Sequence, residues 1–243
     1  MKLNKRSKEL RLKIIELSKK NGGYHYGGSF SCVEILLSLF ENVLKKQNKF
    51  ILSKGHACWG YYVLLKEMGY KPLLEGHPKR DIKNGVEWTT GSEGHGLPAG
   101  IGICLARKIK NIKGNVFVLV GDGECQEGTT WESLLIAAQH NLNNLIVIID
   151  FNKIQGSDFT KNVLNIDSIG DVAKAVGWKV SRIDGHDIGK VTRTLKTKQK
   201  LPHLIIADTI KGKGVSFMEN KVKWHANGLH DDLNEKAIKE LTS

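Results

Sequence analysis

The chain has 243 residues, 40% of them hydrophobic, so it can bury one large core but has little room for several full domains. No apolar run approaches the roughly 18 residues that a membrane-spanning helix needs, and the start, MKLNKRSKEL, lacks the apolar centre of a signal peptide. The 4 cysteines contain no CxxC pair, which favours reduced thiols over a zinc site or disulfides. We therefore predict a cytoplasmic protein, without membrane contact, in which residues 1–243 form a single domain.

The formal net charge is +12, which is compatible with nucleic acid, an acidic protein partner or phosphorylated small molecules as ligands. The basic residues are spread over the whole chain and are not interleaved with aromatic side chains, as they are in single-strand-binding proteins. We therefore predict a solvated lysine surface and no nucleic-acid partner.

The amino-terminal part, about residues 1–50, is predicted to be a helical segment of this domain. Leu3, Leu10, Ile14 and Leu17 are spaced among lysines as on one face of a helix. A glycine-rich break, NGGYHYGGS, follows, and apolar helices are predicted over residues 31–43 and 57–68. We expect the first helix, which is amphipathic, to dock its apolar face on another surface.

The clearest pattern lies in the centre of the chain, in NVFVLVGDGECQEGTTWESLLIAAQHNLNNLIVIIDFN. A β-branched run, a glycine turn, a helical pattern and a second β-rich run form a βαβ unit. Both runs are apolar throughout, as in parallel strands that helices cover on both faces. A strand over residues 178–183, a helix over 188–198 and a strand over 204–207 follow. The predicted fold class is α/β, with a doubly wound, mostly parallel sheet and helices on both faces.

Polar residues follow both central strands, at the edge where open parallel sheets bind ligands. A right-handed crossover brings the two strand ends together, so Asp122 and Asn152 are predicted to be neighbours. With the Ile154 carbonyl, their oxygens suit Mg²⁺, and such a site also accepts Ca²⁺ or Mn²⁺. Gly121 and Gly123 would let a diphosphate approach the backbone, at the positive end of the following helix.

GDG alone is an ordinary turn. The order of apolar strand, GDG, helix, second apolar strand and DFN, however, resembles the thiamine diphosphate enzymes and their fold. More motifs follow the order seen in transketolases: ILSKGHA, GHP, TTGSEGHGLPAGIGICLA, GDGECQEGTTWES, IIDFNKIQ, DGHD, and KGKGVSFMEN followed by WH. They extend from the turn around His25 to His225, nearly the whole chain. The chain is thus similar to the amino-terminal, diphosphate-binding subunit of a split transketolase.

The resemblance implies roles for several residues that would otherwise be read as structural. His56 and His225 would contact the diphosphate, His25 and His77 would line the substrate channel, and His225 would also serve catalysis. The loop with Gly91 and Glu93 would lie against the aminopyrimidine ring, where related chains usually carry leucine in place of Glu93. That glutamate is a departure from the family pattern.

Glu127 and Glu132 follow the GDG turn near the start of a helix, where acidic residues often simply favour the helix dipole. In transketolases, glutamates at these positions lie at the interface between subunits and communicate with the catalytic glutamate of the partner. The resemblance therefore implies a catalytic role at an interface for both.

By the same resemblance, the protein transfers a two-carbon ketol unit from a ketose phosphate to an aldose phosphate, as in the pentose phosphate pathway, using thiamine diphosphate and Mg²⁺. The domain that holds the aminopyrimidine in this family has no counterpart in the sequence. Either the chain is a fragment or another chain completes the site. We predict the second case, a two-plus-two heterotetramer with a complementary carboxy-terminal subunit, and no activity without that partner.

Two other functions remain open at this stage. The first is the corresponding subunit of a 2-oxoacid dehydrogenase, although KGHA, GHP and the tail from KGKG to WH favour transketolase over it. The second is a catalytically silent scaffold subunit, for which Glu93 is the supporting residue.

Overall fold

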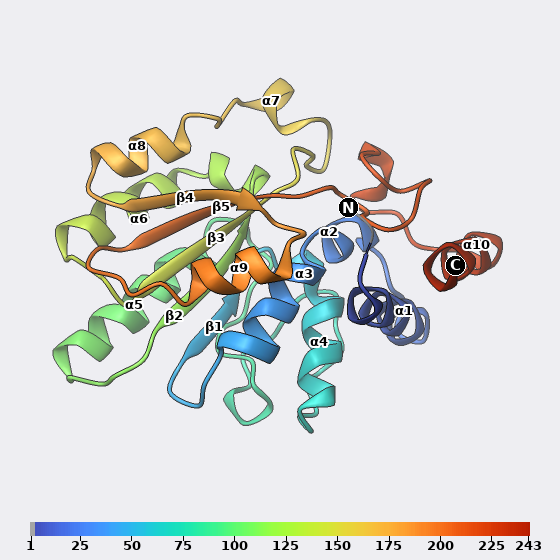
Figure 1. The fold of residues 1–243 in the computed structure, drawn as a ribbon, viewed down its shortest axis with the longest axis horizontal. Coiled ribbons are helices and arrows are strands. Elements are labelled where there is room, and N and C mark those ends of the chain that lie inside the picture. The colour runs from blue at the N-terminus through green and yellow to red at the C-terminus, as the bar shows by residue number, and fades with distance from the viewer. Residues whose placement is uncertain (1–2) are drawn as a thin grey trace.

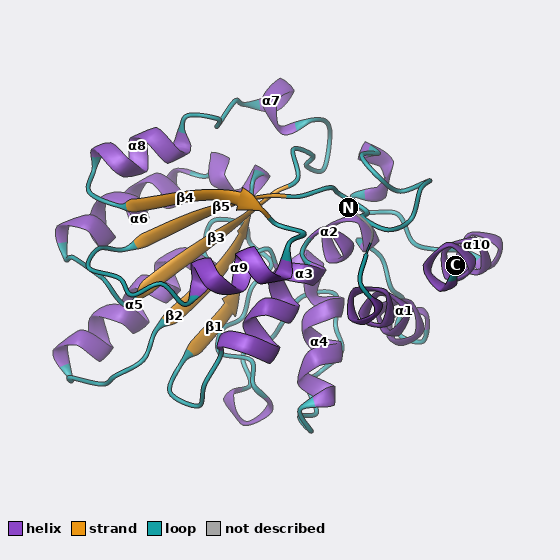
Figure 2. Cartoon of the chain, viewed as in Figure 1, coloured by secondary structure: helices purple, strands orange, loops and turns teal. Residues whose placement is uncertain are grey.

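A five-stranded parallel sheet forms the centre of the molecule (Figures 1 and 2). The computed structural model describes residues 3–243, apart from the side chain of residue 231. The strands are β1 (Lys49–Leu52), β2 (Val116–Gly121), β3 (Leu145–Phe151), β4 (Lys179–Asp184) and β5 (His203–Asp208). Their order in the sheet is β1-β2-β3-β5-β4, and every neighbouring pair is parallel. All carboxyl ends therefore lie along one edge.

Helices cover both faces of this sheet. They are α1 (Lys5–Lys19), α2 (Tyr26–Ser31), α3 (Val33–Leu37), α4 (Cys58–Glu67), α5 (Gly96–Ile109), α6 (Gly128–Gln139), α7 (Thr160–Val163), α8 (Ile169–Ala175), α9 (Ile188–Leu195) and α10 (Asp231–Thr242). Alternate residues of each strand enter different cores: Phe117 and Leu119 pack with α1 to α4 and α9, whereas Val116 and Val118 pack with α5, α6 and α8. The predicted doubly wound α/β fold is confirmed.

The connections explain which helix lies on which face. The chain passes from β1 to β2, β3 and β4 in one direction across the sheet, through α5, α6 and α8 on one face. It then returns from β4 to β5 through α9, on the opposite face. Because crossovers between parallel strands are right-handed, reversing the direction of travel changes the face that the helix covers.

The helical elements near the amino terminus differ in detail from their prediction. The α1 helix begins after Asn4, whose side chain accepts the Ser7 N–H at 2.7 Å, and buries Leu10 and Ile14 as expected. The helix predicted over residues 31–43 is three pieces: α2, which begins earlier, at Tyr26, then α3, and a π-helical stretch, Ser38–Val43. The predicted helical segment also ends with a strand, because β1 begins at residue 49.

Five elements were missed by the sequence reasoning, namely β1, α5, α7, α8 and α10. The β1 strand has only four residues, too few for an apolar pattern to be recognised. The α5 helix contains several glycines, which disfavour helices, but Gly100 allows it to approach the sheet: an added Cβ would lie 2.6 Å from Val118 Cγ2. The polar tail forms α10, which packs Ala237 and Leu241 against the core beside α1.

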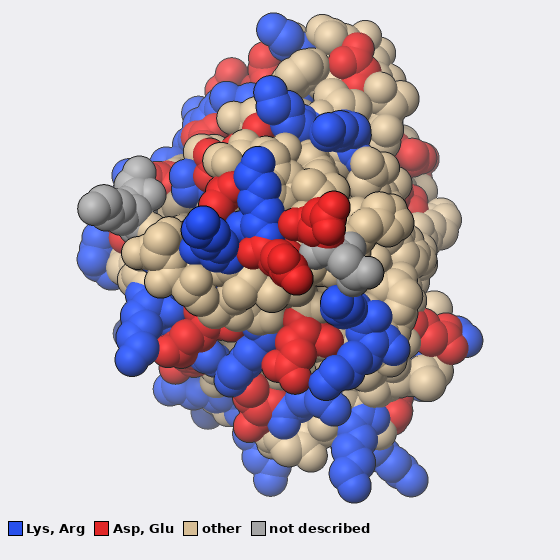
Figure 3. Space-filling model, turned by 90° about the vertical axis from the view of Figure 1, so that its right-hand side faces the viewer, with Lys and Arg blue, Asp and Glu red and all other residues tan. Residues whose placement is uncertain are grey.

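The face formed by α1 and α10 carries basic and acidic side chains side by side (Figure 3). Arg6, for example, contacts both Glu41 and Glu67 there, and Lys13 contacts Glu67 at 2.6 Å. No helix in the described part of the chain is long and apolar enough to cross a membrane.

Candidate functional site

Asp122 and Asn152 lie at neighbouring strand ends, because β2 and β3 pair along their whole length. Both side chains are buried, with 2% and 4% of their surface exposed. Asp122 accepts the N–H of Gly123 at 2.8 Å and that of Lys153. Asn152 Oδ1 accepts the N–H of Ile154 at 3.1 Å. The turns after the two strands thus fix both polar side chains.

These groups fit a magnesium ion. Burial, and after it the charge of Asp150, raises the pKa of Asp122 to about 6, so a nearby cation would stabilise its charged form. The carboxylate of Asp122, the carboxamide of Asn152 and the Ile154 carbonyl are the hard oxygen donors that Mg²⁺ prefers. Among the described residues, no group of three His, Cys, Asp or Glu could hold a metal ion.

The two glycines of the GDG turn differ in their surroundings. A Cβ added to Gly121 would make ordinary van der Waals contacts with the Cβ atoms of Lys54 and Glu124, 3.8 and 3.9 Å away. A Cβ added to Gly123 would lie 2.8 Å from the Cβ of Gln155, so this glycine permits the turn to pack on the loop after β3. Close packing therefore requires glycine at position 123 and does not require it at position 121.

A buried ion pair between Lys54 and Asp150 lies beneath the site. The two side chains are 1% and 0% exposed. Asp150 also accepts the hydroxyls of Ser31 and Thr209 and the Asn152 amide. Burial alone would raise the pKa of Asp150, but Lys54 outweighs it and the pKa is lowered. This network holds the end of β3 and orients Asn152.

Lys211 brings a second buried ammonium to the same place. Its Nζ donates to the Ile154 carbonyl at 2.8 Å and to His225 Nδ1 at 2.9 Å. Burial, and after it the charge of Lys54, lowers the pKa of Lys211 to about 8. A cation therefore already lies beside one of the three oxygen donors, and it can meet an anionic ligand.

Three histidines lie close together beside these buried charged residues. The ring centroids of His25, His56 and His225 are 5.0 to 5.2 Å apart. His25 has a left-handed backbone, φ 59°, and its Nδ1 bonds the His225 carbonyl. Burial lowers the pKa of all three, that of His225 to about 2, so they are neutral near pH 7.

His77 and the loop with Glu93 join the same group. A Cβ added to Gly91, which has φ 144°, would lie 3.1 Å from the His77 ring, so the glycine allows loop and ring to pack closely. Glu93 Oε1 lies 3.3 Å from His56 Nδ1, and 39% of the glutamate side chain is exposed. The carboxylate of Glu93 therefore lies beside the imidazole of His56.

Glu124, which the sequence reasoning missed, ties this loop to the GDG turn. Its buried carboxyl accepts the N–H groups of Gly94 and Gly121 at 3.0 Å and the hydroxyl of Ser53. Burial raises the pKa of Glu124 to about 7. The position of Glu93 therefore depends on a contact made within the turn after β2.

Glu127 and Glu132 are not among the buried side chains of this cluster, although Glu127 packs against Gly94 of the Glu93 loop. Glu127 precedes α6 and Glu132 lies in its first turns, and both are exposed. Their helix also exposes Leu135 and Ile136. Exposed acidic and apolar side chains on one helix agree with an interface, and the interface role remains a prediction.

Lys54, Asp150 and Lys211 were also missed as site residues. A signal was present, because Lys54 and Asp150 follow or end apolar strand-like runs, where a charged residue has no apolar face to cover. For Lys211, the glycine-flanked KGKG motif gave no indication of its contacts, since Ile154 lies 57 positions away in the sequence.

Residues 4–242 match the protein family described as transketolase, thiamine diphosphate binding domain. The chain belongs to this family. It is 41% identical over 263 residues to one of the subunits of the apulose-4-phosphate transketolase of Actinobacillus succinogenes, and the match covers 98% of this chain and 95% of that one. It is 32% identical to the 6-deoxy-6-sulfo-D-fructose transketolase subunit of a Clostridium species, over 95% of this chain and 92% of that one.

The transketolase of Campylobacter jejuni has the same fold, with a TM-score of 0.85 and 27% identity. The match covers 98% of this chain but 42% of that transketolase, so the chain spans less than half of it. The subunits named above, by contrast, have nearly the same length as this chain. The resemblance to an amino-terminal transketolase subunit, and with it the assignment to an enzyme of the transferase class, is confirmed.

Proposed function

We propose that this chain is the diphosphate-binding subunit of a transketolase that moves a two-carbon ketol unit from a ketose phosphate to an aldose phosphate. The observation that carries the proposal is that Lys211 joins the turn after β3 to His225, directly beside Asp122 and Asn152. Thiamine diphosphate, when bound, supplies the carbanion stabilisation that such a transfer requires. The residues of this chain bind it, orient it and move protons.

The binding groups fall into two sets. The proposed magnesium ligands are Asp122, Asn152 and the Ile154 carbonyl, and Ca²⁺ or Mn²⁺ would suit the same oxygens. The proposed diphosphate contacts are Lys211, His56, His225 and the backbone around Gly121 and Gly123. The ammonium of Lys211 is buried, so its attraction for phosphate oxygens is weakly screened by water.

The hydrogen bonds of two histidines define complementary proton positions. His25 donates from Nδ1 to the His225 carbonyl, so its Nε2 is the unprotonated nitrogen and can accept a proton. His225 accepts from Lys211 at Nδ1, so its proton is on Nε2 and can be donated. Two neutral rings, about 5 Å apart, thus offer one base and one donor to a sugar hydroxyl, with His77 lining the same channel.

We propose that a second polypeptide holds the aminopyrimidine half of the cofactor. We propose a complementary carboxy-terminal subunit in a two-plus-two heterotetramer, with Glu127 and Glu132 at the interface. The relatives that are themselves named as transketolase subunits support a split enzyme. Their names, which include apulose 4-phosphate and a sulfofructose, make sugar phosphates and related ketoses the substrate class to test, together with pentose phosphate intermediates. The buried, unpaired cysteines agree with a cytoplasmic location.

The test is reconstitution. The purified chain, its candidate partner and their mixture are assayed for ketol transfer with thiamine diphosphate, Mg²⁺ and a panel of ketose phosphate donors. We expect negligible turnover by either chain alone and turnover by the mixture. Full turnover by this chain alone would contradict the split site, and turnover of pyruvate in place of ketoses would favour the 2-oxoacid dehydrogenase alternative. Cofactor binding by the mixture without any turnover would favour the scaffold alternative.

A further inference from the structure

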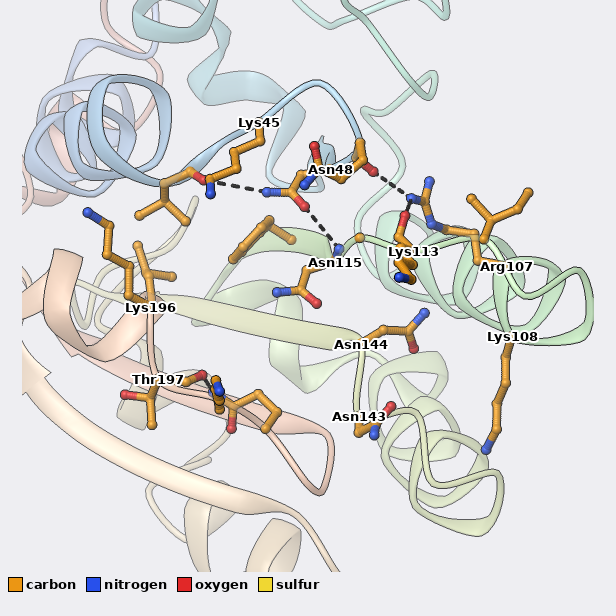
Figure 4. Close-up of a pocket in the computed structure, with 18 of the residues that line it drawn as sticks. Lys45, Asn48, Arg107, Lys108, Lys113, Asn115, Asn143, Asn144, Lys196 and Thr197 are labelled. Carbon is orange, nitrogen blue, oxygen red and sulfur yellow. Dashed lines mark hydrogen bonds between the residues drawn. The ribbon is translucent and has the colours of Figure 1, made fainter.

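A cavity of about 850 Å³ opens at the edge of the sheet opposite the proposed cofactor site, at the amino ends of β2 and β3 (Figure 4). Its walls come from the segment before β1, the end of α5 and the turn after it, the turn before β3, and the segment after α9. Because a strand rises about 3.3 Å per residue, the six residues of β2 separate this cavity from Asp122 by roughly 15 to 20 Å. It is therefore distinct from the cofactor site.

The lining of this cavity is strongly basic. It contains six cations and no carboxylate: Lys45, Arg107, Lys108, Lys113, Lys196 and Lys198. None of the six forms an ion pair with any described residue, in contrast to the mixed charges around α1 and α10. Six uncompensated charges around one concavity create a positive potential that attracts anions.

The fold assembles this charge from distant parts of the chain. Residues 42–66, 94–121, 133–149 and 188–207 contain no aspartate or glutamate, and each contributes to the cavity wall. Figure 4 shows Lys45 and Lys196 on one side of the cavity and Arg107, Lys108 and Lys113 on the other. Cations that approach from opposite sides can contact one polyanion together.

Arg107 is the fixed part of this arrangement. Its side chain is buried, 7% exposed, and its Nη2 donates to the backbone carbonyls of Gln47 and Lys113. Its Nε is buried and has no partner. A buried guanidinium without a carboxylate is costly, because the charge is neither solvated nor neutralised. A bound anion would neutralise it.

Two carboxamides in the wall have free acceptor atoms. Asn144 donates from Nδ2 to the Cys104 carbonyl, and Gln199 donates from Nε2 to the Thr197 carbonyl and lies 2.9 Å from His203 Nδ1. The Oδ1 of Asn144 and the Oε1 of Gln199 are buried and unpartnered. These oxygens need a hydroxyl or amino donor, and the sugar and base of a nucleotide carry several.

We propose that this cavity binds a nucleoside di- or triphosphate, with its phosphates on the lysines and Arg107 and its sugar or base donating to Asn144 and Gln199. The cavity volume falls in the range of about 300 to 1,000 Å³ that is usual for small-molecule sites. A duplex fits less well, because its phosphates are spread along a line whereas the cations here surround one hollow. This binding is independent of the proposed ketol transfer.

The test is calorimetric titration of the full chain with ATP, inorganic tripolyphosphate, phosphate and a DNA duplex, each also in the presence of excess thiamine diphosphate and Mg²⁺. We expect saturable binding of ATP that thiamine diphosphate does not displace. Lys196→Glu/Lys198→Glu should weaken ATP binding at least about tenfold. The matched variant Lys236→Glu/Lys239→Glu, on α10, changes the net charge equally and should leave it unchanged.

Gln199→Leu separates the nucleoside part of the proposal from the phosphate part, since it removes a free acceptor and no charge. It should weaken ATP binding several-fold and tripolyphosphate binding little. Several outcomes would overturn the proposal: no binding at millimolar ATP, displacement by thiamine diphosphate, equal losses in both double variants, tighter binding of duplex than of ATP, or equal effects of Gln199→Leu on both ligands.

Discussion

Arg11→Met tests the buried charge cluster that ties α1 and α3 to the segment carrying Lys211. Arg11 Nη1 donates to Glu34 Oε1 at 2.7 Å, and His186 Nδ1 contacts Glu34 Oε2 at 2.8 Å. The Ile210 N–H donates to His186 Nε2 at 2.9 Å. Burial alone would raise the pKa of Glu34, but Arg11 and His186 outweigh burial and lower it to about 2.

The cost of removing the cation follows from this geometry. The buried carboxyl of Glu34 would have to stay charged without Arg11 or take up a proton. Protonation at pH 7 costs about 3 kcal/mol, because the ordinary pKa is 4.5 and each pH unit is worth about 1.4 kcal/mol. His186 cannot replace the cation without losing the Ile210 hydrogen bond, because a protonated imidazole has no acceptor. We expect the free energy of unfolding to fall by about 3 to 5 kcal/mol.

The stability loss in Arg11→Met should depend on pH in a defined direction. In the native protein the contribution of Glu34 is fully present above pH 4.5 and is lost as the pH falls toward about 2, since the folded pKa is lowered. In Arg11→Met the folded pKa of Glu34 would be raised instead. The free energy of unfolding that Arg11→Met loses relative to the native protein should therefore be about 2 to 3 kcal/mol smaller at pH 5 than at pH 7.

Urea unfolding followed by tryptophan fluorescence, at pH 5 and pH 7, measures both effects. Arg182→Met is the matched control, because Arg182 makes an equally close pair with Asp208, at 2.7 Å, but the two side chains are 50% and 39% exposed. Removing an exposed ion pair of this kind should lower the free energy of unfolding by less than about 1 kcal/mol. The reasoning would be refuted if the two variants lost equal free energies of unfolding, or if the loss in Arg11→Met did not change with pH.

The remaining predictions concern the assembled complex. Asp122→Ala or Asn152→Ala should sharply weaken magnesium-dependent binding of thiamine diphosphate, because each removes a proposed cation ligand, and unchanged affinity by titration would place the metal elsewhere. His77→Ala should lower kcat more than cofactor affinity, and His56→Ala should do the reverse, so equal effects on both quantities would abolish the distinction. Glu93→Leu should tighten cofactor binding about tenfold, because roughly 1 to 2 kcal/mol of desolvation is relieved, whereas equal or weaker binding would mean that the native glutamate is needed.

Matched variants separate these effects from general damage. Asp171→Ala removes an exposed carboxylate on α8, and His140→Ala removes an exposed imidazole after α6. Neither should change cofactor affinity or turnover, so a loss in either would indicate that the assembled complex tolerates substitution poorly.

The sequence by itself determined the central unit of the fold. The apolar runs of β2 and β3 are long enough to be recognised as strands covered on both faces, and the helix between them completes a right-handed crossover. The proximity of Asp122 and Asn152 was therefore predictable, because chain direction and handedness leave one arrangement of the two strand ends. Motif order was sufficient for the family, because the motifs extend over nearly the whole chain.

Tertiary structure alone decided which charged groups surround those strand ends. Lys211 reaches Ile154 across 57 positions, and Glu124 fixes the loop of Glu93 through a backbone N–H of Gly94. No local pattern encodes such contacts, since they depend on how packed elements are placed. The basic cavity has the same origin: four acid-free segments carry no visible signal singly, and only the parallel sheet gathers their lysines at one edge.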